Sequence, residues 1–174
     1  AIDGTFYVTN YSVTYEKGVA RMDRLEARGG GTLYVNCYTA ADDVIAEGAK
    51  FYIASGSGLD AGTVYFNNGS SAVDASYNRQ LREIVRLAKA KKATLNVFGY
   101  ASSRTRNTDI VSHKMANFRV SAARAENVAN ALRRAGMPAS KIKVEALSDS
   151  NPAYLEVMPE GERLNRRAEI YISY

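Results

Sequence analysis

Two residues of opposite charge, Asp109 and Arg124, stand fifteen positions apart in the last third of the sequence. A guanidinium binds a carboxylate bidentately in a fixed plane, and a carboxylate accepts hydrogen bonds from an ammonium group. Such a pair can hold a ligand that carries both groups, as the free end of an amino acid does. The sequence offers no credible Ser/His/Asp or Cys/His set for nucleophilic catalysis. We therefore expect a binding protein and not an enzyme.

The sequence predicts neither a metal site nor a cofactor. Its single histidine, His113, has no Cys, Asp or Glu at ligand spacing beside it, and we interpret it as a solvent-exposed residue at a helix start. The single cysteine, Cys37, lies in an alternating run and is interpreted as a strand residue. The glycine run 29–31 is not followed by the Lys-Ser/Thr of a phosphate-binding loop.

Length and composition favour a globular domain with a substantial additional segment. The chain has 174 residues, of which 46% are hydrophobic and 24% are charged. The net charge of +5 is moderately basic, but Lys and Arg are spread along the predicted helices without interleaved aromatic residues, so we predict no nucleic-acid binding. No apolar run approaches the roughly 20 residues that span a bilayer, and no signal peptide is visible. Because the sequence starts at Ala1 without Met, the missing leader does not argue against export.

The first sixty residues are predicted to form a β-rich segment. β-Branched and aromatic residues with partial alternation predict strands at 5–13, 32–38 and 50–54. Weaker patterns indicate short helices at 19–28 and 42–49. The Ser-Gly stretch 55–58 is interpreted as a linker or turn, and no internal repeat is visible.

From residue 63 the pattern is cleaner and predicts the order β-α-β-α-β-β. The predicted strands are 63–66, 94–98, 141–146 and 167–172. A helix capped by Ser70 or Ser71 and running to about Lys92 has one apolar stripe, made by Leu81, Ile84, Val85 and Ala88. A second helix is expected from about 116 to 135, ended by Gly136 and Pro138. A loop of about twenty residues precedes the final strand, which is expected to add antiparallel to otherwise parallel strands.

Five short motifs occur in order between Val64 and the C-terminus. They are Val64-Tyr65-Phe66 with a polar turn and Ser70, Gly99-Tyr100 at a strand end, Asn117-x-x-Val120-Ser121-x-x-Arg124-Ala125-x-x-Val128 on a helix, Gly136-Met-Pro-Ala-Ser-Lys-Ile142, and Asn165-Arg166-Arg167-Ala168-Glu169-Ile170. In this order they resemble the OmpA-like C-terminal domain, the peptidoglycan-binding module of outer-membrane, Pal-type and motor-anchoring proteins. The resemblance covers about two-thirds of the chain. It implies an α+β two-layer sandwich with a mixed sheet at 61–174, preceded by the β-rich segment 1–60.

The resemblance also implies a ligand, the diaminopimelate side chain of the wall peptide. In that family an aspartate just after the strand end takes the ammonium, and the helix arginine takes the carboxylate. Here Gly99-Tyr100 is followed by Ala101-Ser102, so that without a gap Ser102 replaces the aspartate and the carboxylate is lost.

A second alignment places the family aspartate at Asp109. It treats residues 101–107 as an insertion and gives Asp109 the family's spacing of eight residues to Asn117 and fifteen to Arg124. This preserved spacing favours Asp109 over Ser102. The ligand-binding residues that the resemblance implies are Asp109, Thr108, Arg124, Asn117, Arg166 and Asn68.

Simpler interpretations stand beside these. Arg124 could be a solvated helix residue paired with Glu126, Asp109 a turn residue or helix cap, and Arg167 a surface charge at a strand start. Asn117 could cap the helix as well as contact the ligand. Asn67 also departs from the family, which has an acidic residue there.

The implied function is non-covalent binding of peptidoglycan that anchors an envelope protein in the periplasm, in association with the outer membrane. Residues 1–60 are then expected to dock envelope protein partners, and a lipid anchor outside this sequence is compatible with that role. The alternative is a structural component of an envelope-spanning secretion, conjugation or flagellar assembly, in which the wall-binding site is altered or lost. The changed strand end and the first sixty residues favour this alternative.

Overall fold

The computed structural model describes residues 58–103, 109–149 and 152–173, together with the backbone of five earlier strands. The earlier strands are β1 (Thr5–Val8), β2 (Val19–Arg28), β3 (Thr32–Val35), β4 (Tyr38–Glu47) and β5 (Lys50–Ile53). The chain divides into two compact units, residues 1–60 with 171–174, and residues 61–170. In the described part of the chain, no helix is both long enough and apolar enough to cross a membrane.

The first unit contains parallel strands. β1 pairs with β3 and β3 with β5, in a register that aligns Tyr7, Tyr34 and Tyr52. β2 pairs with β4 in the same sense. The helices predicted at 19–28 and 42–49 are therefore wrong, because ladder pairing outweighs a weak helical pattern. The aligned strands read Thr-Phe-Tyr-Val, Thr-Leu-Tyr-Val and Lys-Phe-Tyr-Ile, a short repeat that the sequence analysis did not identify.

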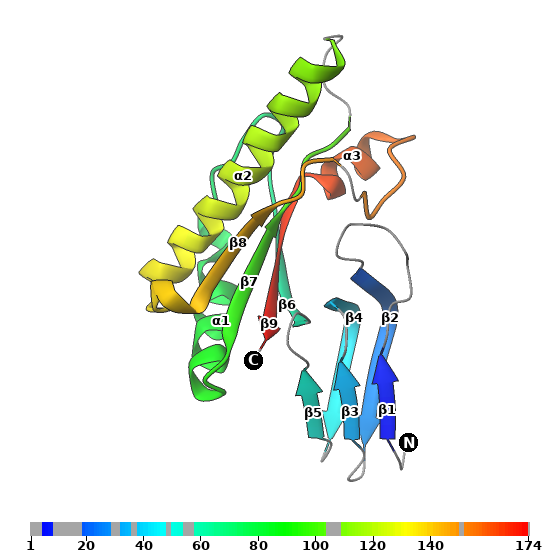
Figure 1. The fold of residues 1–174 in the computed structure, drawn as a ribbon, viewed down its shortest axis with the longest axis vertical. Helices are drawn as coiled ribbons and strands as arrows, with labels where there is room; N and C mark the ends of the chain where they lie inside the picture. Colours follow the sequence, from blue (N-terminus) through cyan, green and yellow to red (C-terminus); the bar gives the residue numbers. More distant parts are fainter. Residues whose placement is uncertain are drawn as a thin grey trace. The chain divides into compact units, whose positions relative to one another are not determined.

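The second unit is built on four strands in the order β6-β9-β7-β8. Their bounds are Gly58–Tyr65, Arg167–Ser173, Thr94–Gly99 and Ile142–Ala146 respectively. β7 and β8 are parallel. β9 is antiparallel to its neighbours β6 and β7, because its first residues lie beside the last residues of both (Figure 1). The Phe66 amide donates to Arg166 O (2.8 Å), and the Tyr100 amide donates to Arg167 O (2.9 Å). The sheet is mixed, as expected.

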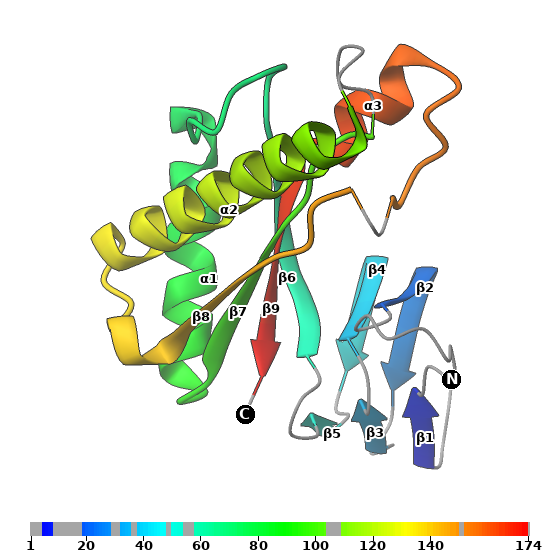
Figure 2. The same ribbon diagram turned by 45° about the horizontal axis from the view of Figure 1, so that its top comes forward.

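Two helices, α1 (Asn78–Ala90) and α2 (Ile110–Arg134), cover one face of this sheet (Figures 1 and 2). The predicted apolar stripe of α1, from Leu81 to Ala88, is buried. Gly99 lies directly under α2, because a Cβ on Gly99 would come within 2.0 Å of Ser121 O. Any side chain there would force α2 away from the sheet, so this glycine sets the closeness of helix and strand. Gly136, with φ +102°, follows α2 as predicted.

The helix boundaries differ from the predictions in three places. Residues 75–77 form a 3₁₀ turn capped by Asp74, and α1 starts only at Asn78, because the hydroxyl of Ser70 is used locally by the Ala72 amide. α2 starts at Ile110, about six residues earlier than expected. The predicted loop before β9 contains a short helix, α3 (Pro159–Asn165), and β8 follows a 3₁₀ turn at Ala139–Lys141.

Candidate ligand-binding site at the sheet edge

Arg124 is the centre of the candidate site. It lies just past the middle of α2, and its side chain reaches the segments that follow β6 and β7. There its Nε donates to Ser70 O (3.0 Å) and its Nη1 to Tyr100 O (2.9 Å). Its guanidinium also lies 5.4 Å from the centroid of the Phe66 ring. Only 2% of the residue is exposed. The interpretation of Arg124 as a solvated residue paired with Glu126 is therefore wrong, and Glu126 pairs instead with Arg133.

The charge of Arg124 is not neutralised within the described residues. Both of its hydrogen bonds go to main-chain carbonyls, and no carboxylate of the described part of the chain forms an ion pair with it. Burial, and then the positive charge of Arg166, lower its pKa from 12.5 to about 10, so that it keeps its charge at neutral pH. A buried cation without a counter-charge is costly in the free protein and favours the arrival of an anion.

Arg166 provides the second positive charge. It lies between α3 and β9, where its Nε donates to Phe66 O at 3.3 Å. Phe66 therefore lies against both arginines. An open cleft of about 450 Å³ begins at this point and is lined by residues of the β6–α1 connection and by Arg163; Phe66 and Ser70, which contact Arg124, line it too. The structure thus brings Arg124 and Arg166 together at Phe66, one of the residues that line the cleft.

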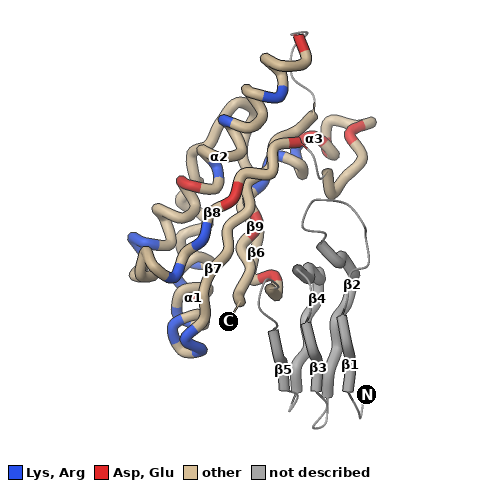
Figure 3. The backbone as a smooth tube through the Cα atoms, viewed as in Figure 1, with Lys and Arg blue, Asp and Glu red and all other residues tan. Residues whose placement is uncertain are grey.

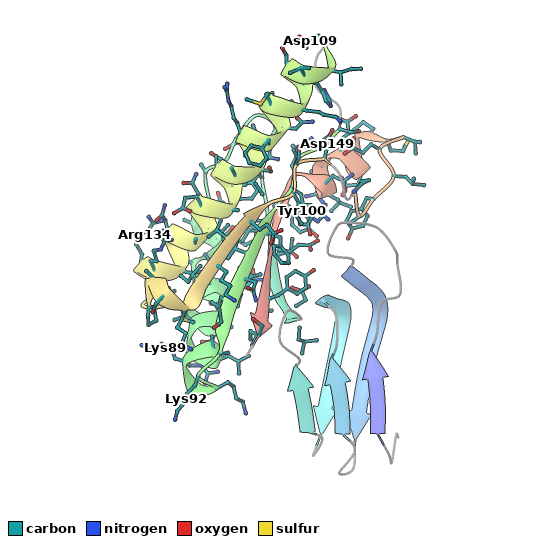
Figure 4. All side chains as sticks on the ribbon, in the orientation of Figure 1. Lys89, Lys92, Tyr100, Asp109, Arg134 and Asp149 are labelled. Atoms are coloured by element: carbon teal, nitrogen blue, oxygen red, sulfur yellow. The ribbon has the colours of Figure 1, made fainter. Side chains whose placement is uncertain are left out.

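Asp109 is not part of this arrangement. Its carboxylate caps α2 by accepting from the amides of Val111 and Ser112, both at 3.0 Å, and these bonds lower its pKa. Fifteen helical residues separate it from Arg124, which corresponds to about 22 Å along the axis. Figure 4 shows Asp109 at the tip of α2, away from Tyr100, whose carbonyl holds Arg124. The expected pairing of Asp109 with Arg124 is thus corrected. The alignment that treats residues 101–107 as an insertion requires a loop after Asp109, whereas α2 already begins at Ile110.

Replacing Asp109 by Ala is expected to loosen the first turn of α2 without changing ligand binding. The amides of Val111 and Ser112 lose their acceptor, so their hydrogen exchange should become faster. Hydrogen-exchange mass spectrometry of this turn, combined with a peptidoglycan-binding assay, checks both halves of the prediction. If Asp109→Ala no longer binds peptidoglycan although the rest of α2 is intact, Asp109 is part of the binding site and the prediction is wrong.

Asn117 is buried within α2 and does not cap it. Its Nδ2 donates to Asp149 Oδ2 at 3.1 Å, and His113, one turn earlier, lies at the same distance from that oxygen. His113 is therefore partly covered, where an exposed residue was expected. Burial raises the pKa of Asp149, but hydrogen bonds from His113, Asn117 and Ser148 outweigh it, and the pKa is lowered. No group of three or more metal-ligating side chains occurs among the residues that the structure describes.

The remaining predicted site residues are less informative. Asn68 is exposed in the turn after β6, two residues before the Ser70 carbonyl that holds Arg124. Thr108 lies outside the described residues. Ser102, the alternative to Asp109, is 8% exposed and follows the end of β7, two residues beyond Tyr100. The alignment without a gap, which puts Ser102 at the position of the family aspartate, therefore selects a residue near Arg124, and the alignment with the insertion does not.

A carboxylate that the sequence analysis missed lies at this strand end. Glu156, in the loop before α3, accepts from the Ser103 amide through Oε2 (2.9 Å), from the Ser103 hydroxyl, and from Asn165 Nδ2 through Oε1 (2.8 Å). Ser102 also hydrogen-bonds to it. A single glutamate within a predicted loop of twenty residues carries no signal that could have identified it.

Three basic residues of the described part of the chain lie away from this site. Lys89, Lys92 and Arg134 gather at the C-terminal ends of α1 and α2, opposite to the end that carries Asp149 and Tyr100 (Figures 3 and 4). Cations at helix C-termini interact favourably with the helix dipole. In the described part of the chain, these three basic residues thus lie at helix ends, whereas the candidate site rests on two individual arginines.

Comparison with known proteins agrees with the fold. The chain is 33% identical over 111 residues to "Probable lipoprotein YiaD" of Escherichia coli, a match that covers 63% of this chain and 48% of that protein. The chain thus spans about half the length of this curated relative.

Two solved structures share the fold. The peptidoglycan-associated lipoprotein of Burkholderia pseudomallei is 23% identical with a TM-score of 0.55, covering 64% of this chain and 89% of that one. The cell wall anchor of the T6SS from Pseudomonas aeruginosa is 27% identical with a TM-score of 0.53, covering 64% and 78%. The sequence profile of the OmpA family matches residues 65–166, more than half of the chain. The resemblance found in the sequence is thereby confirmed: this chain belongs to the OmpA family, whose domain is a non-enzymatic binding module.

Proposed function

We propose that the domain binds peptidoglycan non-covalently, through the free amino-acid end of diaminopimelate in the wall peptide. Arg124 receives the carboxylate of this end group, and Arg166 adds a second positive charge beside it. The observation that carries the proposal is the buried guanidinium of Arg124, which has no carboxylate partner among the described residues of this OmpA-family domain. It contacts Phe66 and Ser70, which line the cleft.

The contacts of Arg124 suit this role. Two carbonyls, Ser70 O and Tyr100 O, fix the plane of the guanidinium through Nε and Nη1. Nη2 forms no such hydrogen bond with a described residue, so it can donate to an incoming carboxylate. Because the side chain is already oriented and desolvated, little conformational entropy is lost on binding.

The cleft beside Phe66 provides room for the peptide that carries the end group. Its lining from Tyr65 to Tyr77 contains polar, aromatic and small aliphatic residues, and Asn67 belongs to it. Asn68 follows Asn67 in the same turn, and Asn117 lies two turns before Arg124 on α2. These two residues are assigned to the outer parts of the site, with Asn117 acting through its bond to Asp149.

This function is that of a cell-wall anchor in the periplasm. It is supported by two structural relatives, a peptidoglycan-associated lipoprotein and a cell wall anchor, and by the sequence relative, a probable lipoprotein. Each site is expected to bind with modest affinity. Many copies along the polymer would then give a durable attachment to the outer membrane or to an envelope complex.

The test is co-sedimentation of the chain with purified peptidoglycan that contains diaminopimelate, beside peptidoglycan with lysine at the same position. Lysine keeps the ammonium and lacks the carboxylate that Arg124 is proposed to receive. Saturable pelleting with the first polymer and little with the second is expected. Equal pelleting with both polymers would contradict recognition of the end group.

The alternative is a component of an envelope-spanning assembly. It is favoured by three exposed apolar residues on one face of the first turns of α2, Val111 (70%), Met115 (48%) and Phe118 (52%). Such a face is typical of a contact with another protein. A folded chain that fails to pellet with either polymer would favour this alternative.

A further inference from the structure

The end of β7 lacks the acidic side chain that recognition of an ammonium requires. Ser102, at this position, is a neutral residue and is nearly buried. Asp109 is held in the cap of α2, about 22 Å along the helix from Arg124. A ligand with both an ammonium and a carboxylate would therefore meet only half of a site if the strand end acted alone.

Glu156 brings a carboxylate to this position from a different segment. Ser102 and Ser103 both donate to it, so its oxygens lie directly over the residues that replace the acidic position. Burial raises its pKa, but the hydrogen bonds from Ser103, Asn165 and Ser102 prevail and lower it, which keeps the carboxylate ionised at neutral pH.

Asn165 holds the loop that presents Glu156. Its Oδ1 accepts from the amides of Ala153 and Tyr154, both at 3.1 Å, and its Nδ2 donates to Tyr154 O at 2.7 Å and to Glu156 Oε1 at 2.8 Å. Asn165 itself is fully buried. The position of Glu156 is therefore fixed by the residue that directly precedes Arg166, one of the two cations of the site.

The spacing between this carboxylate and Arg124 suits an amino-acid end group. Arg124 is bonded to the Tyr100 carbonyl, and Ser102, two residues farther along the chain, lies at most about 7 Å from Tyr100. An end group with one hydrogen bond at its ammonium and one at its carboxylate spans roughly 8–9 Å. Arg124 on α2 is bonded to Tyr100, which follows β7, and Glu156 is bonded to Asn165, which lies two residues before β9.

We propose that Glu156 is the acceptor for the ammonium of the ligand and replaces the strand-end aspartate that this chain lacks. The proposal rests on the proposed function, because it assigns a specificity-determining residue to the same site. The hydroxyls of Ser102 and Ser103 can rotate away from Glu156 when the ammonium arrives, which frees lone pairs on the carboxylate.

Asp149 is the rival carboxylate. Its Oδ2 is occupied by Asn117 and by the ring of His113, and its Oδ1 accepts from the Ser148 hydroxyl at 3.0 Å. Asn117 lies seven residues before Arg124 on α2, about 10 Å along the axis. These contacts tie Asp149 to α2, in the segment that follows β8, and β7 separates β8 from β9 in the sheet.

The experiment measures peptide binding by isothermal titration calorimetry with the whole chain. One peptide is L-Ala-γ-D-Glu-meso-diaminopimelate, and the other carries 2-aminopimelate, which keeps the distal carboxylate and lacks the distal ammonium. The variants are Glu156→Gln, the rival Asp149→Asn, and Glu160→Gln as the matched control, since Glu160 is exposed and pairs with Arg163. The intact chain and Glu160→Gln are expected to prefer the first peptide by about 10-fold, which corresponds to one charge-assisted hydrogen bond.

Glu156→Gln is expected to remove this preference while it leaves the affinity for the 2-aminopimelate peptide unchanged. A purely structural role of Glu156 would weaken both peptides equally and keep their ratio, which would overturn the proposal. Loss of the preference in Asp149→Asn, with Glu156→Gln unaffected, would assign the ammonium to Asp149. If the intact chain binds neither peptide, the proposed function itself fails.

Discussion

Arg124→Lys is expected to weaken binding of the diaminopimelate peptide by about 100-fold while the domain stays folded. The guanidinium uses Nε and Nη1 to hold two carbonyls and has Nη2 left for the ligand. A lysine has one nitrogen on a flexible stem, so it cannot hold the strand ends and present a donor in a fixed plane at the same time. A 100-fold loss corresponds to about 2.7 kcal/mol, which lies within the roughly 1.5–3 kcal/mol that one charge-assisted hydrogen bond contributes.

The matched control is Arg119→Lys, which makes the same exchange at an exposed position of α2. Calorimetry with the peptide and circular dichroism of both variants separate binding from folding. Arg119→Lys should bind as the unaltered chain does. If Arg124→Lys keeps full affinity, the carboxylate is bound elsewhere, and the buried charge of Arg124 serves only to join α2 to the strand ends.

Where a segment had strong periodicity, its structure could be predicted from the sequence. The stripe from Leu81 to Ala88 fixes the buried face of α1, and the alternation of 167–172 fixes β9. Gly136 ends α2 because its positive φ suits glycine. The weakly patterned stretches 19–28 and 42–49 could not be assigned, because strand pairing decided their structure and pairing depends on distant residues.

The candidate site could be predicted only in part. Arg124 and Arg166 could be selected from the sequence because they lie in motifs that keep their order along the chain, and the structure brings both of them to Phe66. Asp109 was selected by its spacing alone, and spacing does not reveal whether a segment is loop or helix. Glu156 could not be found from its neighbours in sequence, since its partner Ser103 is 53 residues away.

Residues Arg167 and Glu169 form a buried ion pair whose disruption is expected to have the largest effect on stability. Arg167 Nε donates to Glu169 Oε1 at 2.6 Å, and their side chains are 1% and 2% exposed. The guanidinium also lies 4.0 Å from the centroid of the Tyr100 ring. The interpretation of Arg167 as a surface charge is therefore wrong. Since Gly99 faces α2, Tyr100 and this pair lie on the opposite face of the sheet.

The pair fixes the register of β9 as well as its stability. A shift of one residue would move both charges to the face that α2 covers, against Leu95 and Val97. Glu169→Leu is expected to destabilise the domain by about 3–5 kcal/mol, because it removes the buried carboxylate from Arg167. Arg167→Met should have an effect of similar size, because it leaves the buried carboxylate of Glu169 without its cation.

The double variant distinguishes an ion pair from two independent contributions. Arg167→Met combined with Glu169→Leu removes both charges, and apolar replacements of a whole buried pair are often nearly neutral. We therefore expect the double variant to be more stable than either single variant, as measured by urea unfolding at neutral pH. If the two losses add up instead, each side chain stabilises β9 through its other contacts, such as the bond from Arg167 Nη1 to Asn165 Oδ1. In that case, the arginine would be coupled directly to the residue that positions Glu156, and peptide binding should weaken in Arg167→Met but not in Glu169→Leu.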